Sequence, residues 1–163
     1  MKDDAAARAS ELVRRTRVAA LATVHGSGPG VALVPYAIAP GTEGLLVLVS
    51  ALSAHTRDLL ADPHVALLIA EADHAGGPPH ALARVSLQAR AAAIARDAAT
   101  FAAARDAYAA RFPDMAMLFD LGDFTLFLLV PTAVRVVTGF AQARNLRADT
   151  LLRALDGRTE AAG

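Results

Sequence analysis

Cysteine and tryptophan are absent from this 163-residue chain, and aromatic residues make up only 5% of it. Without cysteine the chain can form no disulfide, no thiolate metal site and no thiol nucleophile. An excess of charge is also lacking, since 16 lysines and arginines balance 16 aspartates and glutamates. A net charge of zero disfavours nucleic acid and anionic membrane surfaces as partners, and it favours a small-molecule ligand.

Long apolar runs are missing as well. The longest apolar stretch without a charge, Phe124–Val134, is interrupted by Pro131 and is too short to span a bilayer. The chain begins with charged residues at positions 2 to 4 instead of an apolar signal core, so no export is expected. We therefore expect a soluble, cytoplasmic protein with a single domain over residues 1–163, and 55% hydrophobic residues suffice for its core.

Hydrophobic periodicity predicts a mainly β chain, of the α+β class, with short flanking helices. Strands are expected at 18–24, 31–39, 45–49, 65–70, 83–95 and 124–138, the last being one long bent strand or two strands divided at Pro131. Helices are expected at 3–17, 53–61, 97–111 with Asp97 as the N-cap, and 146–155, with a short helical turn at 115–118. Glycine-rich turns at 25–30 and 40–44 link the first three strands into a meander. These short connections argue for a small closed or split β-barrel, with a helix at 1–17 and a helix and tail at 146–163.

The segment Ser50–Pro63 carries the most functional information. It joins two strands and concentrates polar residues where a helix begins, namely Ser53, His55, Thr56 and Arg57. The first N–H groups of a helix have no intrahelical partner and the helix dipole adds partial positive charge, so this segment predicts a phosphate pocket. The alternative is that Ser53 only caps the helix while Arg57 and Asp58 face water.

Several short motifs carry a family resemblance: Ala22-Thr23-Val24, Gly28-Pro29, Val34-Pro35-Tyr36, the segment Ser50–Leu59, and Asp62-Pro63. Their order resembles that of the pyridoxamine 5'-phosphate oxidase-like, FMN-binding split-barrel proteins. The segment at 55–59, with Gly122-Asp123-Phe124 and Gly139-Phe140, is similar to the haem-utilization branch of that family. The resemblance covers about residues 18–146. It implies a six-stranded Greek-key split barrel that forms a homodimer with flavin sites at the subunit interface.

The resemblance also implies a set of cofactor-binding residues. It places the backbone of Val34, Pro35 and Tyr36 along the edge of the flavin ring, and the phosphate at Ser53, His55, Thr56 and Arg57. Ser50, just before this segment, is a further expected cofactor-binding residue. Arg84 and Gln88, on the polar face of the expected strand 83–95, match positions where relatives approach the flavin; otherwise they are an ordinary solvent-facing pair. No metal site is expected, because the five histidines have no regular spacing.

Two departures separate the chain from true pyridoxamine phosphate oxidases. Leu33 and Ile38 occur in the stretch where a lysine or arginine pair commonly helps to bind phosphate, and residues 140–146 lack the Arg-x-His substrate signature. The expected function is therefore an FMN-dependent oxidoreductase acting on another small molecule, with the redox chemistry supplied by the flavin and the catalytic residues unassigned. Two alternatives stay open: a haem-binding or haem-degrading protein with His74 or His80 as candidate iron ligands, and a non-catalytic flavin-binding dimer.

Overall fold

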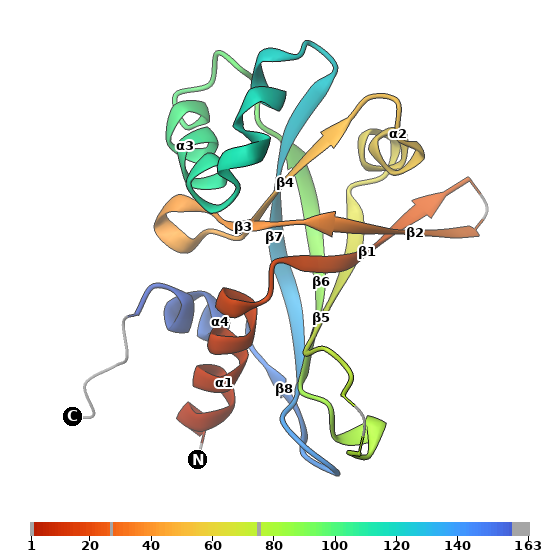
Figure 1. The fold of residues 1–163 in the computed structure, drawn as a ribbon, viewed down its shortest axis with the longest axis vertical. Coiled ribbons are helices and arrows are strands. Elements are labelled where there is room, and N and C mark those ends of the chain that lie inside the picture. Colours follow the sequence, from red (N-terminus) through yellow and green to blue (C-terminus); the bar gives the residue numbers. More distant parts are fainter. Residues whose placement is uncertain (1, 27, 75, 158–163) are drawn as a thin grey trace.

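The computed structural model describes residues 2–26, 28–74 and 76–157. Within these residues one antiparallel sheet of eight strands curls into a split barrel with helices packed at its ends (Figure 1). The strand order is β2-β1-β5-β6-β7-β4-β3, and β8 pairs with β7. The strands are β1 (Val18–His25), β2 (Gly28–Pro35), β3 (Ala37–Ile38), β4 (Leu45–Ser50), β5 (His64–Ala70), β6 (Arg84–Ala93), β7 (Phe124–Val137) and β8 (Ala143–Leu146).

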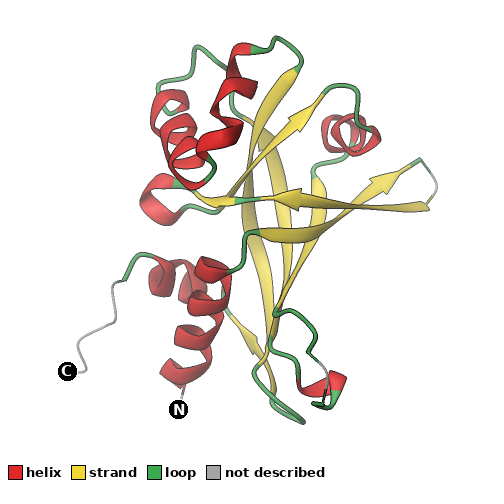
Figure 2. Ribbon diagram, in the orientation of Figure 1, coloured by secondary structure: helices red, strands yellow, loops and turns green. Residues whose placement is uncertain are grey.

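Short helical segments connect several of the strands, and one helix precedes the first strand and another follows the last (Figure 2). The α-helices are α1 (Lys2–Arg15), α2 (Ala54–Ala61), α3 (Phe101–Arg111) and α4 (Ala148–Leu155). The 3-10 helices are η1 (Pro40–Thr42), η2 (Pro79–Ala81) and η3 (Pro113–Asp120). None of the helices in the described part of the chain is long and apolar enough to cross a membrane.

Strand β4 is apolar throughout because both of its faces are covered. Val47 and Val49 belong to the core inside the barrel, whereas Leu46 and Leu48 pack with residues of α3 and η3 in a second core. By contrast, β6 alternates between buried and exposed positions, because only its inner face is covered. The sheet therefore has one strand enclosed on both faces and a row of strands whose outer face is open.

Tyr36 lies where the two edges of the sheet meet. Strand β2 pairs with β1 and strand β3 pairs with β4, yet β2 and β3 are separated in sequence only by Tyr36. The predicted strand 31–39 is therefore divided in two, and this division lets one continuous segment link both sheet edges. The Tyr36 side chain is fully buried, and its hydroxyl donates a 2.7 Å hydrogen bond to the carbonyl oxygen of Val13 in α1.

The long strand β7 is continuous through Pro131. Its register with β6 shifts between Gln88 and Ala89, which pair with Ala133 and Pro131 respectively. A bulge of this kind accommodates a residue that cannot donate a backbone hydrogen bond. Of the two alternatives for residues 124–138, one long strand is thus confirmed.

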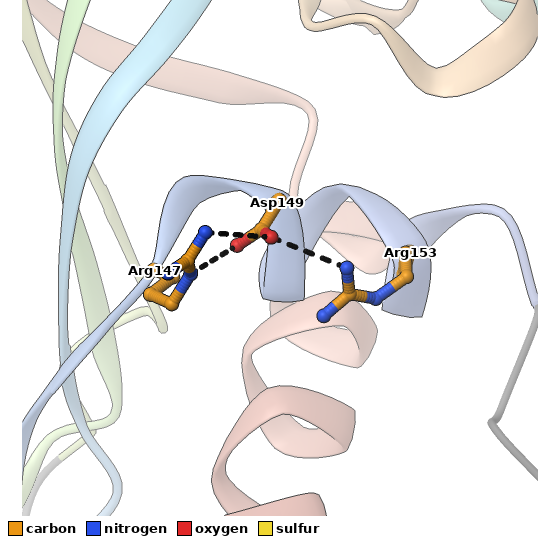
Figure 3. A network of polar contacts seen from close by, with 3 residues as sticks. All are labelled: Arg147, Asp149 and Arg153. Carbon is orange, nitrogen blue, oxygen red and sulfur yellow. Dashed lines mark hydrogen bonds and ion pairs between the residues drawn. The ribbon is translucent and has the colours of Figure 1, made fainter.

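Helices α1 and α4 pack against each other over one end of the barrel, where Leu12 and Leu151 enter the main core. The first turn of α4 carries a small ionic network (Figure 3). Asp149 accepts hydrogen bonds of 3.0 and 3.2 Å from Arg147 and one of 3.2 Å from Arg153. The hydrogen bonds from Arg147 lower the pKa of Asp149. A carboxylate in the first turn also suits the helix dipole.

Three expectations need correction. The sheet has eight strands and not six, because strand 31–39 is divided and β8 carries no alternating pattern from which it could be predicted. Asp97 is not an N-cap: the backbone N–H of Ala98 is bonded to the carbonyl of Ala95 in a turn, and α3 begins at Phe101 after Thr100. Leu146 ends β8, so the last helix begins two residues later than expected.

Candidate functional site

Ser50 ends strand β4 and fixes the loop that leads into α2. Its hydroxyl donates to the carboxylate of Asp123 at 3.1 Å and accepts from the backbone N–H of Leu52 at 3.2 Å. The backbone N–H of Ala51 donates to the carbonyl of Asp123 at 2.6 Å. Through Asp123, the Gly-Asp-Phe motif therefore connects the start of β7 to the loop before α2 by hydrogen bonds.

At the start of α2, some of the side chains predicted to bind phosphate are available to a ligand, and others are already hydrogen-bonded within the fold. Ser53 is the N-cap residue, and its hydroxyl makes no capping hydrogen bond. Arg57 is exposed and His55 is half-buried. Thr56 is buried, and its hydroxyl donates to the carbonyl of Ser50 at 2.6 Å. Ser53, Arg57 and the first N–H groups of the helix can thus meet an anion, whereas the Thr56 side chain is committed to the fold.

Asp58, in the second turn of α2, is a buried carboxylate, although the sequence pattern suggests a position that faces water. Asp58 does not face water, since its side chain is 8% exposed. Its carboxylate accepts a 2.8 Å hydrogen bond from the Thr23 hydroxyl and lies 2.6 Å from Nδ1 of His25. The hydrogen bonds of His25 and Thr23 lower the pKa of Asp58. A Cβ at Gly30 would lie 3.2 Å from the Asp58 carboxylate, so a glycine lets β2 approach it. The residues come from three elements, and no local sequence signal could have revealed the cluster.

The three residues of the predicted flavin-edge strand lie against the barrel core. The side chains of Val34 and Tyr36 are buried, and Pro35 is half-buried. Val34 pairs with Ala19 in the β1–β2 ladder, and the backbone N–H of Tyr36 donates to the carbonyl of Arg17 at 3.2 Å. Val34 and Tyr36 can therefore offer a ligand only backbone atoms, which is the role that the resemblance implies.

Arg84 is not brought to the start of α2, whereas Gln88 pairs with Ala66 nearer the His64 end of the strands. Arg84 lies at the first residue of β6, where its guanidinium donates to the carbonyls of His80 and Leu82 at 3.3 and 3.0 Å. Helix α2 leads into β5 at His64, which pairs with Arg90 near the other end of β6. Six residues of extended strand separate Arg84 from Arg90, a distance of roughly 20 Å. The loop before β6 and helix α2 accordingly lie at opposite ends of the barrel in Figure 1.

An exposed apolar surface crosses β2, β1 and β5, and we call it the outer apolar face. Val31 and Leu33 of β2 are 77% and 72% exposed. They pair with Ala22 and Ala20 of β1, which in turn pair with Ala66 and Leu68 of β5. Because directly paired residues share one side of a sheet, these side chains form a continuous row. The outer apolar face is therefore defined by Ala20, Ala22, Val24, Val31, Leu33, Ala66 and Leu68.

The outer apolar face contains a shallow hollow of about 260 Å³. Gln88 projects from the same side of β6 and lines this hollow, as does His64 at the beginning of β5. The lining further includes Ala22, Val24, Ala66 and Thr132. Of the ten predicted cofactor-binding residues, Gln88 alone contributes to this hollow.

Both ring nitrogens of His64, which lines the hollow, have a hydrogen-bond partner. Its Nδ1 lies 2.7 Å from the carboxylate of Asp62, which also accepts the backbone N–H of His64 at 2.9 Å. Its Nε2 lies 3.0 Å from the guanidinium of Arg90. The hydrogen bonds from the His64 backbone and ring lower the pKa of Asp62. An arginine can only donate, so Nε2 carries the lone pair and Nδ1 carries the proton.

The other histidines do not assemble into a metal centre. His74 and His80 are exposed in the loop between β5 and β6. Among the described residues, no group of three or more potential ligands could hold a metal ion.

Comparison with known proteins places the chain in a family. Residues 5–138 match the family model described as pyridoxamine 5'-phosphate oxidase. The chain belongs to this family. The split-barrel fold that the resemblance implied is confirmed by the curled sheet and by its likeness to solved structures. The likeness to the haem-utilization branch is confirmed as well.

Two curated proteins and one solved structure are among those similar to this chain. The haem oxygenase HutZ of Vibrio cholerae is 31% identical over 134 residues, covering 81% of this chain and 75% of that protein. The chloroplastic non-canonical haem oxygenase HOZ of Arabidopsis thaliana is 38% identical over 100 residues, or 60% of this chain and 28% of that protein. A haem-binding protein from Mycobacterium smegmatis superposes with a TM-score of 0.80 at 29% identity, over 91% of this chain and 60% of that one.

Proposed function

We propose that this chain binds haem on its outer apolar face and takes part in haem degradation. The observation that carries the proposal is the exposed apolar row across β2, β1 and β5. Leu33, in the stretch where the oxidase pattern commonly has basic residues for phosphate, is one of its most exposed members. A contiguous apolar surface of this kind suits a large flat ring better than a phosphate. The haem-related names of the similar proteins give independent support.

The side chains at this face fit the chemistry of haem. The ring needs apolar contacts, its carboxylates need a cation, and its iron needs a nitrogen or sulfur ligand. Val31 and Leu33 provide apolar contacts, Arg90 provides a cation, and His64 provides a nitrogen. When bound, haem would supply a redox-active iron. The chain would bind and orient the ring and shield it from water.

We also propose that a second copy of the chain covers the outer apolar face. A single copy leaves Val31 and Leu33 open to water, and burying such side chains favours association. A homodimer built on this face would place haem between the two copies, as the family resemblance implies for a cofactor.

Titration of ferric haem into the purified protein tests the haem proposal. We expect a Soret band that saturates with added haem, and at least a tenfold loss of affinity in Leu33→Glu, because a charge would be buried against the ring. Leu121→Glu is the matched control, since Leu121 is exposed outside this face. A wild-type protein that takes up no haem would refute the proposal.

FMN binding is the second candidate, and the geometry at the start of α2 favours it. Ser53 has a hydroxyl without a capping bond, and Arg57 projects into solvent beside it. Together with the first N–H groups of α2, they fit a phosphate. With FMN bound, the chain would be an oxidoreductase for another small molecule. Oxidation of pyridoxamine phosphate is not expected, because residues 140–146 lack the substrate signature.

Arg57→Ala separates the phosphate from the rest of the flavin. We expect the variant to weaken FMN binding by about 1.5–3 kcal/mol, the loss of a charged hydrogen bond, with little effect on riboflavin. Arg105→Ala, which removes an exposed arginine of α3, is the control. Isothermal titration with both ligands provides the measurement. Equal weakening of both would show that Arg57 acts on the fold or on the ring.

A further inference from the structure

His64 lies where a ligand on the outer apolar face would meet a nitrogen lone pair. It begins β5 and shares the outer side of that strand with Ala66 and Leu68. It also lines the hollow together with Val24. An imidazole that lines an apolar hollow is available to a flat ring that would bind over that hollow.

The hydrogen bonds of His64 select which ring nitrogen is available. Asp62 holds Nδ1 at 2.7 Å, and this carboxylate is itself fixed by the backbone N–H of His64. A histidine that binds a metal usually donates its other ring N–H to a carboxylate, which sets the tautomer and raises the basicity of the ligating nitrogen. The pair thus presents Nε2 as a base with a defined direction.

Arg90 occupies Nε2 but is well placed to release it. The Arg90 side chain is exposed, and β6 carries it directly opposite His64. Its guanidinium lies 3.0 Å from Nε2, on the solvent-exposed side of the sheet. A carboxylate is a stronger partner for a guanidinium than an imidazole, so a ligand with acid groups would draw Arg90 away.

The described structure does not place the other histidines at this hollow. On β1, His25 lies on the opposite side of the strand from Val24 and meets Asp58 of α2. His55 belongs to α2, and His74 and His80 lie in the loop before β6. The earlier candidates, His74 and His80, are therefore less well placed than His64.

We propose that His64 Nε2 ligates the haem iron, that Asp62 orients it, and that Arg90 moves from Nε2 to a haem carboxylate. This inference rests on the proposed haem function. The step is an exchange without oxidation or reduction: the hydrogen bond between Arg90 and Nε2 breaks, and an iron–nitrogen bond forms.

Ferric haem titrated into the full-length chain provides the test, read by Soret position and by electron paramagnetic resonance. We expect wild type and His74→Ala, a change at an exposed histidine in the loop before β6, to give the same nitrogen-ligated spectrum. His64→Ala should lose that spectrum, bind haem at least tenfold more weakly, and regain the spectrum when imidazole is added. His64→Gln, which keeps a polar side chain at the strand start, should behave as His64→Ala and guards against a folding defect.

The outcomes separate this inference from the proposed function. If His64→Ala binds haem with an unchanged spectrum, the ligand assignment is wrong and the haem function stands. If the wild type takes up no haem, the haem function itself fails and the assignment fails with it. Arg90→Ala should keep the nitrogen-ligated spectrum, and its loss in that variant would also overturn the assignment.

Discussion

At the scale of a single residue, Asp58 connects helix α2 to strand β1 through its hydrogen bonds with Thr23 and His25. A carboxylate in the second turn of a short amphipathic helix ordinarily faces water, yet this one is enclosed between α2 and β1. Its partner His25 remains 62% exposed, so the pair joins a buried group to an accessible one. The cluster fixes α2, and with it the start of the helix where an anion would bind.

The lowered pKa of Asp58 makes folding stability depend on pH. Because the pKa is lower in the folded state than in the unfolded state, the unfolded chain binds the proton first, and stability falls as the pH drops below the ordinary carboxyl pKa of about 4. We expect Asp58→Asn to be less stable than wild type at pH 7, and to lose less stability than wild type between pH 6 and pH 3.

Urea unfolding at a series of pH values measures this difference. Asp120→Asn, at an exposed carboxyl of η3, is the control and should keep the wild-type dependence. Identical slopes for wild type and Asp58→Asn would show that the buried pair is not coupled to folding.

At the scale of elements, β4 and β7 approach each other closely at the turn before β4. Gly44 precedes β4, and a Cβ at this position would overlap the backbone carbonyl oxygen of Leu129 in β7. Backbone cannot move aside as a side chain can, so only glycine fits here. This close approach fixes the position of the turn relative to β7, which pairs with β4 along its whole length.

We therefore expect Gly44→Ala to reduce the free energy of unfolding by about 2–3 kcal/mol, as overpacking in a core typically does. Gly122→Ala is the matched control, since Gly122 lies just before β7 and a Cβ there meets nothing within 4 Å. Thermal or urea unfolding distinguishes the two variants. A Gly44→Ala protein as stable as its control would mean that the turn can shift without cost.

At the scale of the whole molecule, the main feature is that one side of the sheet is not covered by any of the described helices. Most of the barrel interior is closed by α1, α4 and the curled sheet, whereas the outer apolar face of β2, β1 and β5 is left uncovered. The proposed second copy would cover it.

Val31→Glu tests the proposed homodimer. A charge at the centre of an apolar interface should cost about 3 kcal/mol, which weakens the dimer roughly a hundredfold. Sedimentation at micromolar concentration should show a dimer for wild type and for Leu121→Glu, and a monomer for Val31→Glu. A wild type that sediments as a monomer at that concentration would contradict the proposal.

Local sequence patterns determined most of the elements of this protein. The period-two alternation of β6, the uninterrupted apolar run of β4 and the polar start of α2 each follow from side-chain periodicity, which depends only on neighbours in the chain. Ser53 at the beginning of a helix and the glycine-rich hairpin after β1 were predicted for the same reason. The ordered motifs further identified the family.

Tertiary structure alone decided which distant residues meet. The pairing of β2 with β1 and of β3 with β4 divides one predicted strand at Tyr36, since closing the sheet requires its two edges to share one segment. Thr56 is buried and Arg57 is exposed, because the turn places the Ser50 carbonyl where the Thr56 hydroxyl can donate to it. Arg90 meets His64 across 26 residues of sequence through strand pairing. Contacts of this kind depend on the register between strands, which a single sequence does not encode locally.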